Sequence, residues 1–418
     1  MALESAGPST ALIQDDFVVF GLIAATLALI FWLASGPTPF WKKFFAWVPA
    51  LLLCYFIPAL YNTAGLIDGT GSALYHIASR LLLPAALVLL TLSIDLKAIL
   101  RLGPKLLFVF VAGTFGVVLG AIVSFQLMAW IWPEAVAGDT WKGMAALAGS
   151  WIGGGANMVA IREIFEVDAT LFGQFAVVDV AIASLLMATL LFLANRAPQI
   201  DARSGADTSA IDEMRERIVA YEAANARIPT LADLMVIVGW AFGVVGLAHA
   251  IAAPVSRWFG ENAQWARNFS LDSPFVWVVV LSTLGGLLLS FTRVRRIENA
   301  GASRVGTVFL YFLIACIGMQ MHFMRLFDRL ELILIGAIWM SVHVAVIWYA
   351  AKLVKAPLFY FAVGSQGNIG AAASAPVVAA AFHPTLAPVG VLLGTVGYAT
   401  GTLVAYGVGQ ILRVMAGQ

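Results

Sequence analysis

The sequence has little charge. Only 11% of its 418 residues are Asp, Glu, Lys or Arg, whereas 61% are hydrophobic. Soluble domains carry roughly 25% charged residues, so the composition excludes an ordinary soluble domain. The net charge is +1, and we therefore expect no nucleic-acid partner, because such partners are attracted by basic surfaces.

Cysteine is equally scarce, since the chain has only Cys54 and Cys316, both inside apolar stretches. Two such residues predict neither a disulfide framework nor a Cys-rich metal site. The His-Glu-x-x-His and Gly-x-Ser-x-Gly motifs are missing, so we expect no enzyme and no resident cofactor. The stretch from Met1 to Asp16 has no Lys or Arg, unlike a cleavable signal peptide, so the first apolar segment is expected to stay.

Long apolar runs are abundant instead. Most are near the ~20 residues with which a helix spans a bilayer. They predict an all-α, multi-pass integral membrane protein of the cell (inner or plasma) membrane, with the lipid bilayer as a partner. Six segments precede the polar stretch 196–230 and six follow it: 17–35, 44–62, 71–94, 104–131, 142–162, 167–195, 231–252, 274–291, 303–325, 331–353, 357–382 and 385–413.

The polar stretch divides the chain into an N-terminal repeat, 1–195, a cytoplasmic linker, 196–230, and a C-terminal repeat, 231–418. The run from Ile211 to Val219 in the linker predicts a short amphipathic helix. Its simplest interpretation is a solvated connector.

The two halves are faintly alike. Gly149-Ser150 matches Gly364-Ser365, and Thr170-Leu171 matches Thr385-Leu386, at the same offset of 215 residues (364 − 149 = 385 − 170). The match suggests an internal duplication, which is common in secondary transporters.

The distribution of Lys and Arg predicts how the segments cross, because these residues concentrate in cytoplasmic loops. If all twelve segments cross, only 10 of the 23 Lys and Arg outside the membrane fall inside, and four arginines between 293 and 304 fall outside. If 142–162 and 357–382 each enter and leave on one side, 16 fall inside and 7 outside. We therefore predict two inverted repeats of five transmembrane helices, each with one re-entrant or broken Gly-rich segment.

Both Gly-rich segments contain polar residues where the chain is predicted to break. Glycine permits tight turns, and broken backbone at membrane depth is tolerated when it is buried in protein or lines a wet cavity. Paired interruptions of this kind predict a transporter binding site, although close packing of small residues would also favour Gly and Ala. The predicted solute-binding residues are Ser150, Gly154, Gly155, Asn157, Ser365, Gln366, Gly367, Asn368 and Gly370.

Asp179 lies about ten residues into the segment 167–195. A carboxylate at that depth usually faces a polar path, so we predict a cation or proton site formed by Asp179, Asn157, Asn368 and Ser374, with Na⁺ as a possible coupling ion. The alternative is a structural pair with a neighbouring polar group. Arg80 either reaches toward the interface or binds a substrate carboxylate.

The two Gly-rich motifs resemble those of the YjcL-like bacterial membrane proteins, a family known mainly as a domain of unknown function. The resemblance runs from about Trp47 to Gly409 and is strongest over Gly149 to Ala160, Gly364 to Ala381 and Pro388 to Gly394.

Segment count, linker position and loop placement are also similar to those of sodium:glutamate symporters. This similarity implies the cation/proton antiporter and anion transporter superfamily, with a scaffold domain, a mobile transport domain and often a homodimer. The symporter loops carry a Gly-Gly-x-Gly type pattern with His, whereas these read Gly153-Gly154-Gly155-Ala156-Asn157 and Gly367-Asn368-Ile369-Gly370, so glutamate is not the expected solute.

The sequence thus predicts a cation-coupled secondary transporter, a symporter of a small anionic organic solute. The loop-bearing domain would move against segments 17–94 and 231–325. The alternative is a cation/proton antiporter without an organic substrate, in which Asp179 carries the charge.

Overall fold

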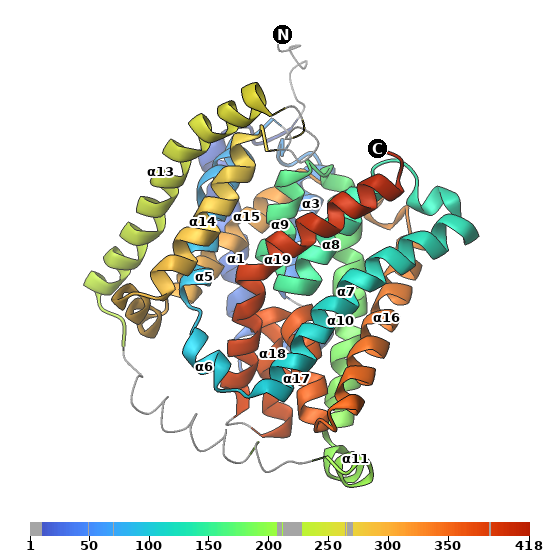
Figure 1. The fold of residues 1–418 in the computed structure, drawn as a ribbon. Helices are drawn as coiled ribbons and strands as arrows, with labels where there is room; N and C mark the ends of the chain where they lie inside the picture. Colours follow the sequence, from blue (N-terminus) through green and yellow to red (C-terminus); the bar gives the residue numbers. More distant parts are fainter. Residues whose placement is uncertain are drawn as a thin grey trace.

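A computed structural model describes residues 11–48, 50–69, 71–206, 211, 228–263, 265, 271–383 and 386–418. Within these residues every named element is a helix (Figure 1). Seven helices are long and apolar enough to cross a membrane, and nine spans result if each of two bent helix pairs counts as one. The protein is therefore a multi-pass, all-helical membrane protein. The helix predicted at 211–219 lies, apart from Ile211, outside the described residues.

Among the described residues, the first half contains ten α-helices and two short helical turns, and α11 follows them at the start of the linker. They are α1 (Asp16–Ala34), α2 (Pro39–Trp47), α3 (Ala50–Thr63), α4 (Leu74–Ile77), the π-helical turn η1 (Ala78–Leu82), α5 (Leu83–Leu92), α6 (Leu96–Leu100), α7 (Pro104–Ile131), η2 (Pro133–Val136), α8 (Thr140–Gly153), α9 (Gly155–Ile164), α10 (Ala169–Ala194) and α11 (Ala197–Ser204).

The second half follows a similar order. Its elements are α13 (Leu231–Asn262), α14 (Pro274–Ser290), η4 (Arg293–Ala300), α15 (Ala302–Gly318), η5 (Phe323–Phe327), α16 (Glu331–Leu353), α17 (Leu358–Ile369), α18 (Ala371–Phe382) and α19 (Ala387–Met415). Three predicted bounds were wrong. The segment predicted at 44–62 begins inside α2, and α3 starts only at Ala50. The segment predicted at 231–252 runs to Asn262, because the helix accommodates Pro254 in its interior, and the segment predicted at 303–325 ends at Gly318, where polar residues follow.

Side chains before several helices account for where those helices begin. Asp15 accepts hydrogen bonds from the amides of Phe17 and Val18, and Asp168 does the same at the start of α10. Thr230 and Asp233 form a reciprocal capping box on α13. Each cap satisfies amides that have no partner inside the helix.

The membrane helices fall into two groups, judged by which of them pack together. The wall group contains α1, α3, α4, α5, α13, α14 and α15, and the hairpin group contains α7 to α10 and α16 to α19. In Figure 1, α5, α13 and α14 lie on the left, while α7, α10 and α16 lie on the right. Contacts between the groups are much sparser than contacts within each group.

The crossing of α7 and α16 organises the hairpin group. A Cβ on Gly116 would lie 3.1 Å from the Cα of His343, and Gly120 faces Trp339 in the same way. The indole of Trp339 donates to the carbonyl of Val117 at 2.7 Å. Small residues here let the two backbones approach closely, as is typical of helix pairs in membranes.

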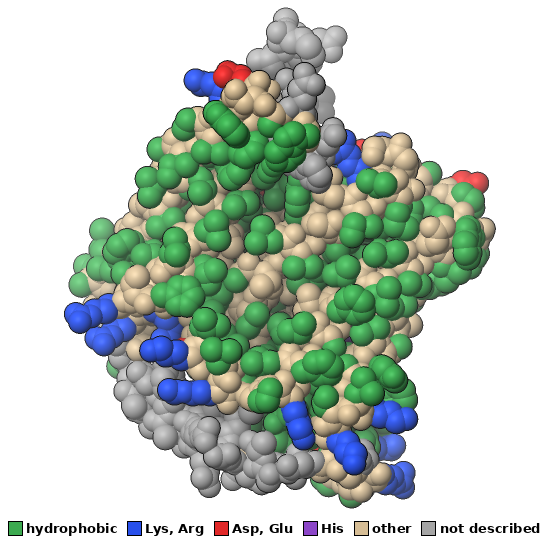
Figure 2. Space-filling view, in the orientation of Figure 1, with side chains coloured by type: hydrophobic (Ala, Val, Ile, Leu, Met, Phe, Trp, Pro, Cys, Tyr) green, Lys and Arg blue, Asp and Glu red, His purple; other side chains and the backbone are tan. Residues whose placement is uncertain are grey.

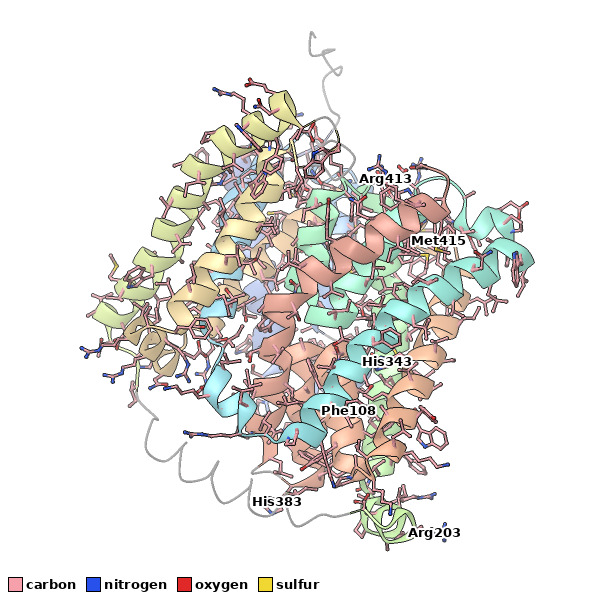
Figure 3. All side chains as sticks on the ribbon, viewed as in Figure 1. Phe108, Arg203, His343, His383, Arg413 and Met415 are labelled. Carbon is pink, nitrogen blue, oxygen red and sulfur yellow. The ribbon has the colours of Figure 1, made fainter. Side chains whose placement is uncertain are left out.

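Basic side chains gather at one end of the molecule, at the bottom of Figure 2. The helix α11, at the start of the linker, lies at this end in Figure 1, and the C-terminus lies at the other. Arg203 and His383 are at the basic end and Arg413 is at the opposite end, with His343 between them (Figure 3). Because Lys and Arg mark the cytoplasmic face, we take the basic end as the inner side.

Candidate functional site

A cavity of about 1000 Å³ lies between the wall group and the hairpin group. Its size is at the upper end of ordinary ligand pockets. The wall group contributes apolar side chains such as Leu90 and Ile314, and the hairpin group contributes both chain breaks together with Val391 and Tyr398. Exposed Arg101 and Arg304 line its mouth. The cavity therefore connects the basic end of the molecule with the two breaks.

Each Gly-rich segment is broken into two helices that fold back on each other. In the first, a Cβ on Gly149 would lie 2.8 Å from the carbonyl oxygen of Asn157, although residues eight apart in one straight helix are about 12 Å apart. In the second, Gln366 donates to Ser374 Oγ at 2.7 Å across an equal separation. The segments α8–α9 and α17–α18 are therefore two hairpins.

The tips of the two hairpins touch. Gly154, at the first tip, has φ 81° and ψ 179°, a conformation that only glycine adopts readily. A Cβ on Gly154 would lie 2.9 Å from the Cβ of Ala371, the second tip, which has φ 47°. In Figure 1, α8 and α9 lie in the upper half and α17 and α18 in the lower half, so the hairpins approach each other from opposite ends.

Two helix N-termini face the cavity at this junction. The helices α9, with 10 residues, and α18, with 12, begin at Gly155 and Ala371, and no side chain caps either start. Residues Gly155, Ala156, Ala372 and Ala373 line the cavity. Free amides and helix dipoles at such ends favour an anion.

Predicted site residues divide between the cavity and the protein behind it. Gly154, Gly155 and Gly370 line the cavity. The other predicted residues lie behind the tips and are absent from its lining. They are Ser150, Asn157, Ser365, Gln366, Gly367, Asn368, Ser374 and Asp179.

Asn157 is fully buried and hydrogen-bonded by protein groups. Its Nδ2 donates to the carbonyls of Gly153, at 2.6 Å, and Gly397. Its Oδ1 accepts from the hydroxyl of Thr402. The amide thus ties the first hairpin to α19.

Asn368 does the same for the second hairpin. Its Nδ2 donates to the carbonyls of Phe110, at 3.0 Å, and Gly364, at 2.9 Å, and its Oδ1 accepts from Thr114 at 2.7 Å. These contacts tie α17 to α7. The two asparagines thus have the same role, because each one holds a hairpin against a neighbouring long helix.

Behind the second tip, Ser365 and Gln366 are buried. The buried imidazole of His343 donates from Nδ1 to the carbonyl of Gly113 at 3.0 Å, and its Nε2 contacts Ser365 Oγ at 2.8 Å. These two contacts link α16 to α7 and to the second hairpin. Gln366 Oε1 is buried without a hydrogen-bond partner among the described residues.

Asp179 accepts two hydrogen bonds from the first hairpin. Ser150 Oγ donates at 2.6 Å and Trp151 Nε1 at 2.8 Å. Both donors are neutral, so these bonds leave the negative charge of the carboxylate uncompensated. The position, about ten residues into α10, agrees with the depth predicted from the sequence.

The cavity mouth combines three arginines with two carboxylates. Asp95 pairs with Arg295, and Glu298 accepts from the hydroxyl of Ser303 at 2.6 Å. With Arg101 and Arg304 the formal charge is 3 − 2 = +1. Burial raises the pKa of Glu298, and the hydrogen bonds from Ser303 offset part of this rise. Protonation of Glu298 at low pH removes one negative charge and makes the mouth more positive.

Tyr398 and Tyr311 line the cavity but were missed by the sequence reasoning, which named no tyrosine as a site residue. Tyr398 lies close to the first tip, since a Cβ on Gly154 would be 3.8 Å from its ring. A signal was available, because Tyr398 occupies the middle of α19 among Gly394, Gly397 and Gly401. A tyrosine that far from either helix end is outside the interfacial belt.

A second, smaller cavity of about 440 Å³ is lined by charged residues, including Arg80, Arg162 and Glu163. The guanidinium of Arg80 lies 4.0 Å from the centre of the Phe275 ring, which gives this residue an aromatic partner. Among the described residues, no group of three or more His, Cys, Asp or Glu is arranged to hold a metal ion.

Comparison with known proteins agrees with the resemblance carried by the two hairpin motifs. The "Uncharacterized membrane protein YjcL" of Bacillus subtilis (strain 168) is 24% identical over 412 residues, which cover 94% of this chain and 95% of that protein. Residues 21–415 match the family described as "Protein of unknown function (DUF819)". Because that match spans nearly the whole sequence, the chain belongs to the DUF819 family of membrane proteins.

Proposed function

We propose that the chain is a cation-coupled secondary transporter, a symporter of a small organic anion that works by alternating access. The observation that carries the proposal is the junction of the two hairpin tips at the deep end of the 1000 Å³ cavity. Two uncapped helix N-termini there offer backbone donors, and such ends bind anionic groups of substrates in transporters built from broken helices.

The charge of the cavity supports an anion over a cation. The cavity-lining groups near the tips are amides and the ring of Tyr398, whereas the two carboxylates that line the cavity lie at its mouth among three arginines. A cationic solute would meet the positive ends of two helix dipoles, which repel it.

The packing of the helices supports two domains that move against each other. The hairpin group corresponds to the predicted transport domain, and the wall group to segments 17–94 and 231–325. The seven long spans, the two bent pairs and α15 are together compatible with two inverted repeats of five crossings. Sparse contacts between the groups are what a rigid-body rearrangement requires.

The proposal is tested by uptake into proteoliposomes. A panel of mono-, di- and tricarboxylates and amino acids, glutamate among them, is offered with and without a Na⁺ or proton gradient. We expect at least one carboxylate to accumulate in a gradient-dependent manner. Gradient-independent leak of the whole panel, or no uptake at all, would contradict the proposal.

Tyr398→Phe is expected to weaken the apparent affinity for the transported anion by roughly 10- to 150-fold, because one hydrogen bond to a charged group contributes about 1.5–3 kcal/mol. The concentration dependence of uptake measures this change. Tyr349→Phe is the control, since Tyr349 is 60% exposed on α16, away from the cavity. Equal affinities in the two variants would remove Tyr398 from the binding site.

Asp179→Asn is expected to abolish gradient-driven accumulation while the protein still folds, because asparagine keeps the size of the side chain but cannot carry the charge. Accumulation ratios and thermal unfolding measure the two effects. Asp139→Asn, which breaks the exposed pair with Lys142, is the control. An unchanged accumulation ratio would leave Asp179 with a structural role only.

The second candidate is a cation/proton antiporter without an organic substrate. The observation that favours it is Asp179, a carboxylate that accepts hydrogen bonds from two neutral donors within a membrane-spanning helix. Proton-driven Na⁺ flux measured without any organic solute separates the two, since a symporter needs the solute for flux.

A further inference from the structure

The side of the molecule opposite the cavity mouth is closed by a compact polar cluster. It joins Arg162, near the end of α9, to residues of the wall group. The side chain of Arg162 is only 5% exposed and that of Glu163 only 6%. Charged side chains this deeply buried are rare unless they are paired.

The ion pair at the centre of this cluster belongs to one helix group. Arg162 and Glu163 are neighbours on the first hairpin, 2.7 Å apart between Nη1 and Oε1. The pair therefore persists whenever the hairpin group moves as a body. The pair holds the two helix groups together only through the contacts that Arg162 and Glu163 make with residues of the wall group.

Those contacts converge on Tyr75 of α4 and on Gln320, which follows α15. The hydroxyl of Tyr75 accepts from Arg162 and donates to Glu163, and Gln320 Oε1 accepts from Arg162 Nη2 at 3.3 Å. The guanidinium also lies 4.6 Å from the centre of the Tyr75 ring. Tyr75 and Gln320, the two partners from the described part of the wall side, are neutral, so the groups can part without exposing an unpaired charge.

One atom of the cluster favours opening. Arg162 Nε is buried and has no hydrogen-bond acceptor among the described residues. A buried donor without a partner is costly, and water relieves this cost once the groups separate. The cluster is thus held by neutral contacts and opposed by one unsatisfied donor.

The adjoining 440 Å³ cavity is not an anion site of its own. It is lined by Arg80 and Arg162 but also by Glu163, Glu166 and Asp168, so its formal charge is 2 − 3 = −1. At the inner mouth, the pair of Asp95 and Arg295 joins two residues that both lie outside the hairpin group.

We propose that Tyr75 and Gln320 with the Arg162–Glu163 pair form the outer gate, a latch that keeps the cavity closed to the outside in this conformation. The inference rests on the proposed alternating access. Opening to the outside breaks the contacts of Tyr75 and Gln320 and leaves the ion pair intact. Weakening either neutral partner therefore shifts the population toward the outward-open state.

A cysteine reporter in the cavity tests the latch without any solute. Ala373 lines the cavity and is exposed, and both native cysteines are buried, so Ala373→Cys is the preferred site for a membrane-impermeant charged maleimide. Labelling rates are measured in inside-out and right-side-out membrane vesicles, and protein without the reporter gives the background. The parent is expected to react mainly from the inner side.

Tyr75→Phe and Gln320→Leu are each expected to raise labelling from the outer side about tenfold, the change in a two-state population that accompanies a lost contact of ordinary strength. Tyr75→Phe keeps the aromatic ring and removes only the hydroxyl, so the fold is preserved. Lys142→Gln, which breaks an exposed ion pair within the hairpin group, is the matched control and is expected to label like the parent.

Outer labelling at the parent rate in both variants would overturn the latch. If such variants still accumulate a carboxylate, only the latch fails and the transporter proposal stands. If labelling shifts as expected while no solute of the panel is accumulated, the latch stands and the proposed function fails.

Discussion

Gly154→Val is expected to abolish carboxylate uptake and to lower the thermal unfolding temperature by roughly 5 °C. The backbone at Gly154 has φ 81° and ψ 179°, and a side chain in such a region costs about 1–3 kcal/mol in strain. Its Cβ would also lie 2.9 Å from that of Ala371. The tips must then separate, and the two helix N-termini no longer converge on one anion. Uptake and thermal unfolding measure both effects.

Gly239→Ala is the matched control, because Gly239 lies in the membrane helix α13 and a Cβ there meets nothing within 4 Å. Alanine is favoured over glycine inside a helix by about 1 kcal/mol, so this variant is expected to be at least as stable as the parent. Normal uptake by Gly154→Val would show that the tip contact is not needed for binding.

Asn368→Leu is expected to lower the free energy of unfolding by about 3 kcal/mol, since a buried polar group that loses its partner costs about 1–3 kcal/mol. The substitution removes two donated bonds and leaves the hydroxyl of Thr114 without its acceptor. Asn157→Leu should behave alike, because Thr402 loses its acceptor there. Thermal unfolding in detergent measures both.

Asn195→Leu is the control, since Asn195 is exposed at the end of α10 and surface changes are usually within about 0.5 kcal/mol. The same experiment separates a structural amide from a cation ligand. If the asparagines bind Na⁺, NaCl stabilises the parent relative to KCl, and both leucine variants lose this difference. Variants as stable as the parent in KCl would contradict the structural role.

The helices were predictable wherever an apolar run ends at a clear signal. The expected bounds 104–131 and 331–353 agree with α7 and α16 to the residue, and Gly103-Pro104 marks the first of them. The breaks at Gly154 and Gly370 were also predictable, because clustered glycines weaken a helix and permit a tight turn inside an apolar run.

Side-chain partners were beyond the reach of the sequence. Asn157 and Asn368 have side chains that can bind a solute or a cation, but the orientation of these side chains depends on how α19 and α7 pack against the hairpins. Tyr398 became a cavity residue only because α19 crosses the first tip. The contact between Arg162 and Tyr75 joins residues 87 positions apart, and no local pattern encodes such a pairing.

The junction of Gly154 and Ala371 has no space for a larger side chain, which limits the substitutions that these two positions can accept. A larger side chain at either position would separate the tips, so we expect that substitutions there cannot change which solute is bound. The opposite face of the cavity, with Leu51, Leu90, Tyr311 and Ile314, carries ordinary side chains that can change in size and polarity independently. Adaptation to a new cargo, in nature or by engineering, is therefore expected to accumulate on that face.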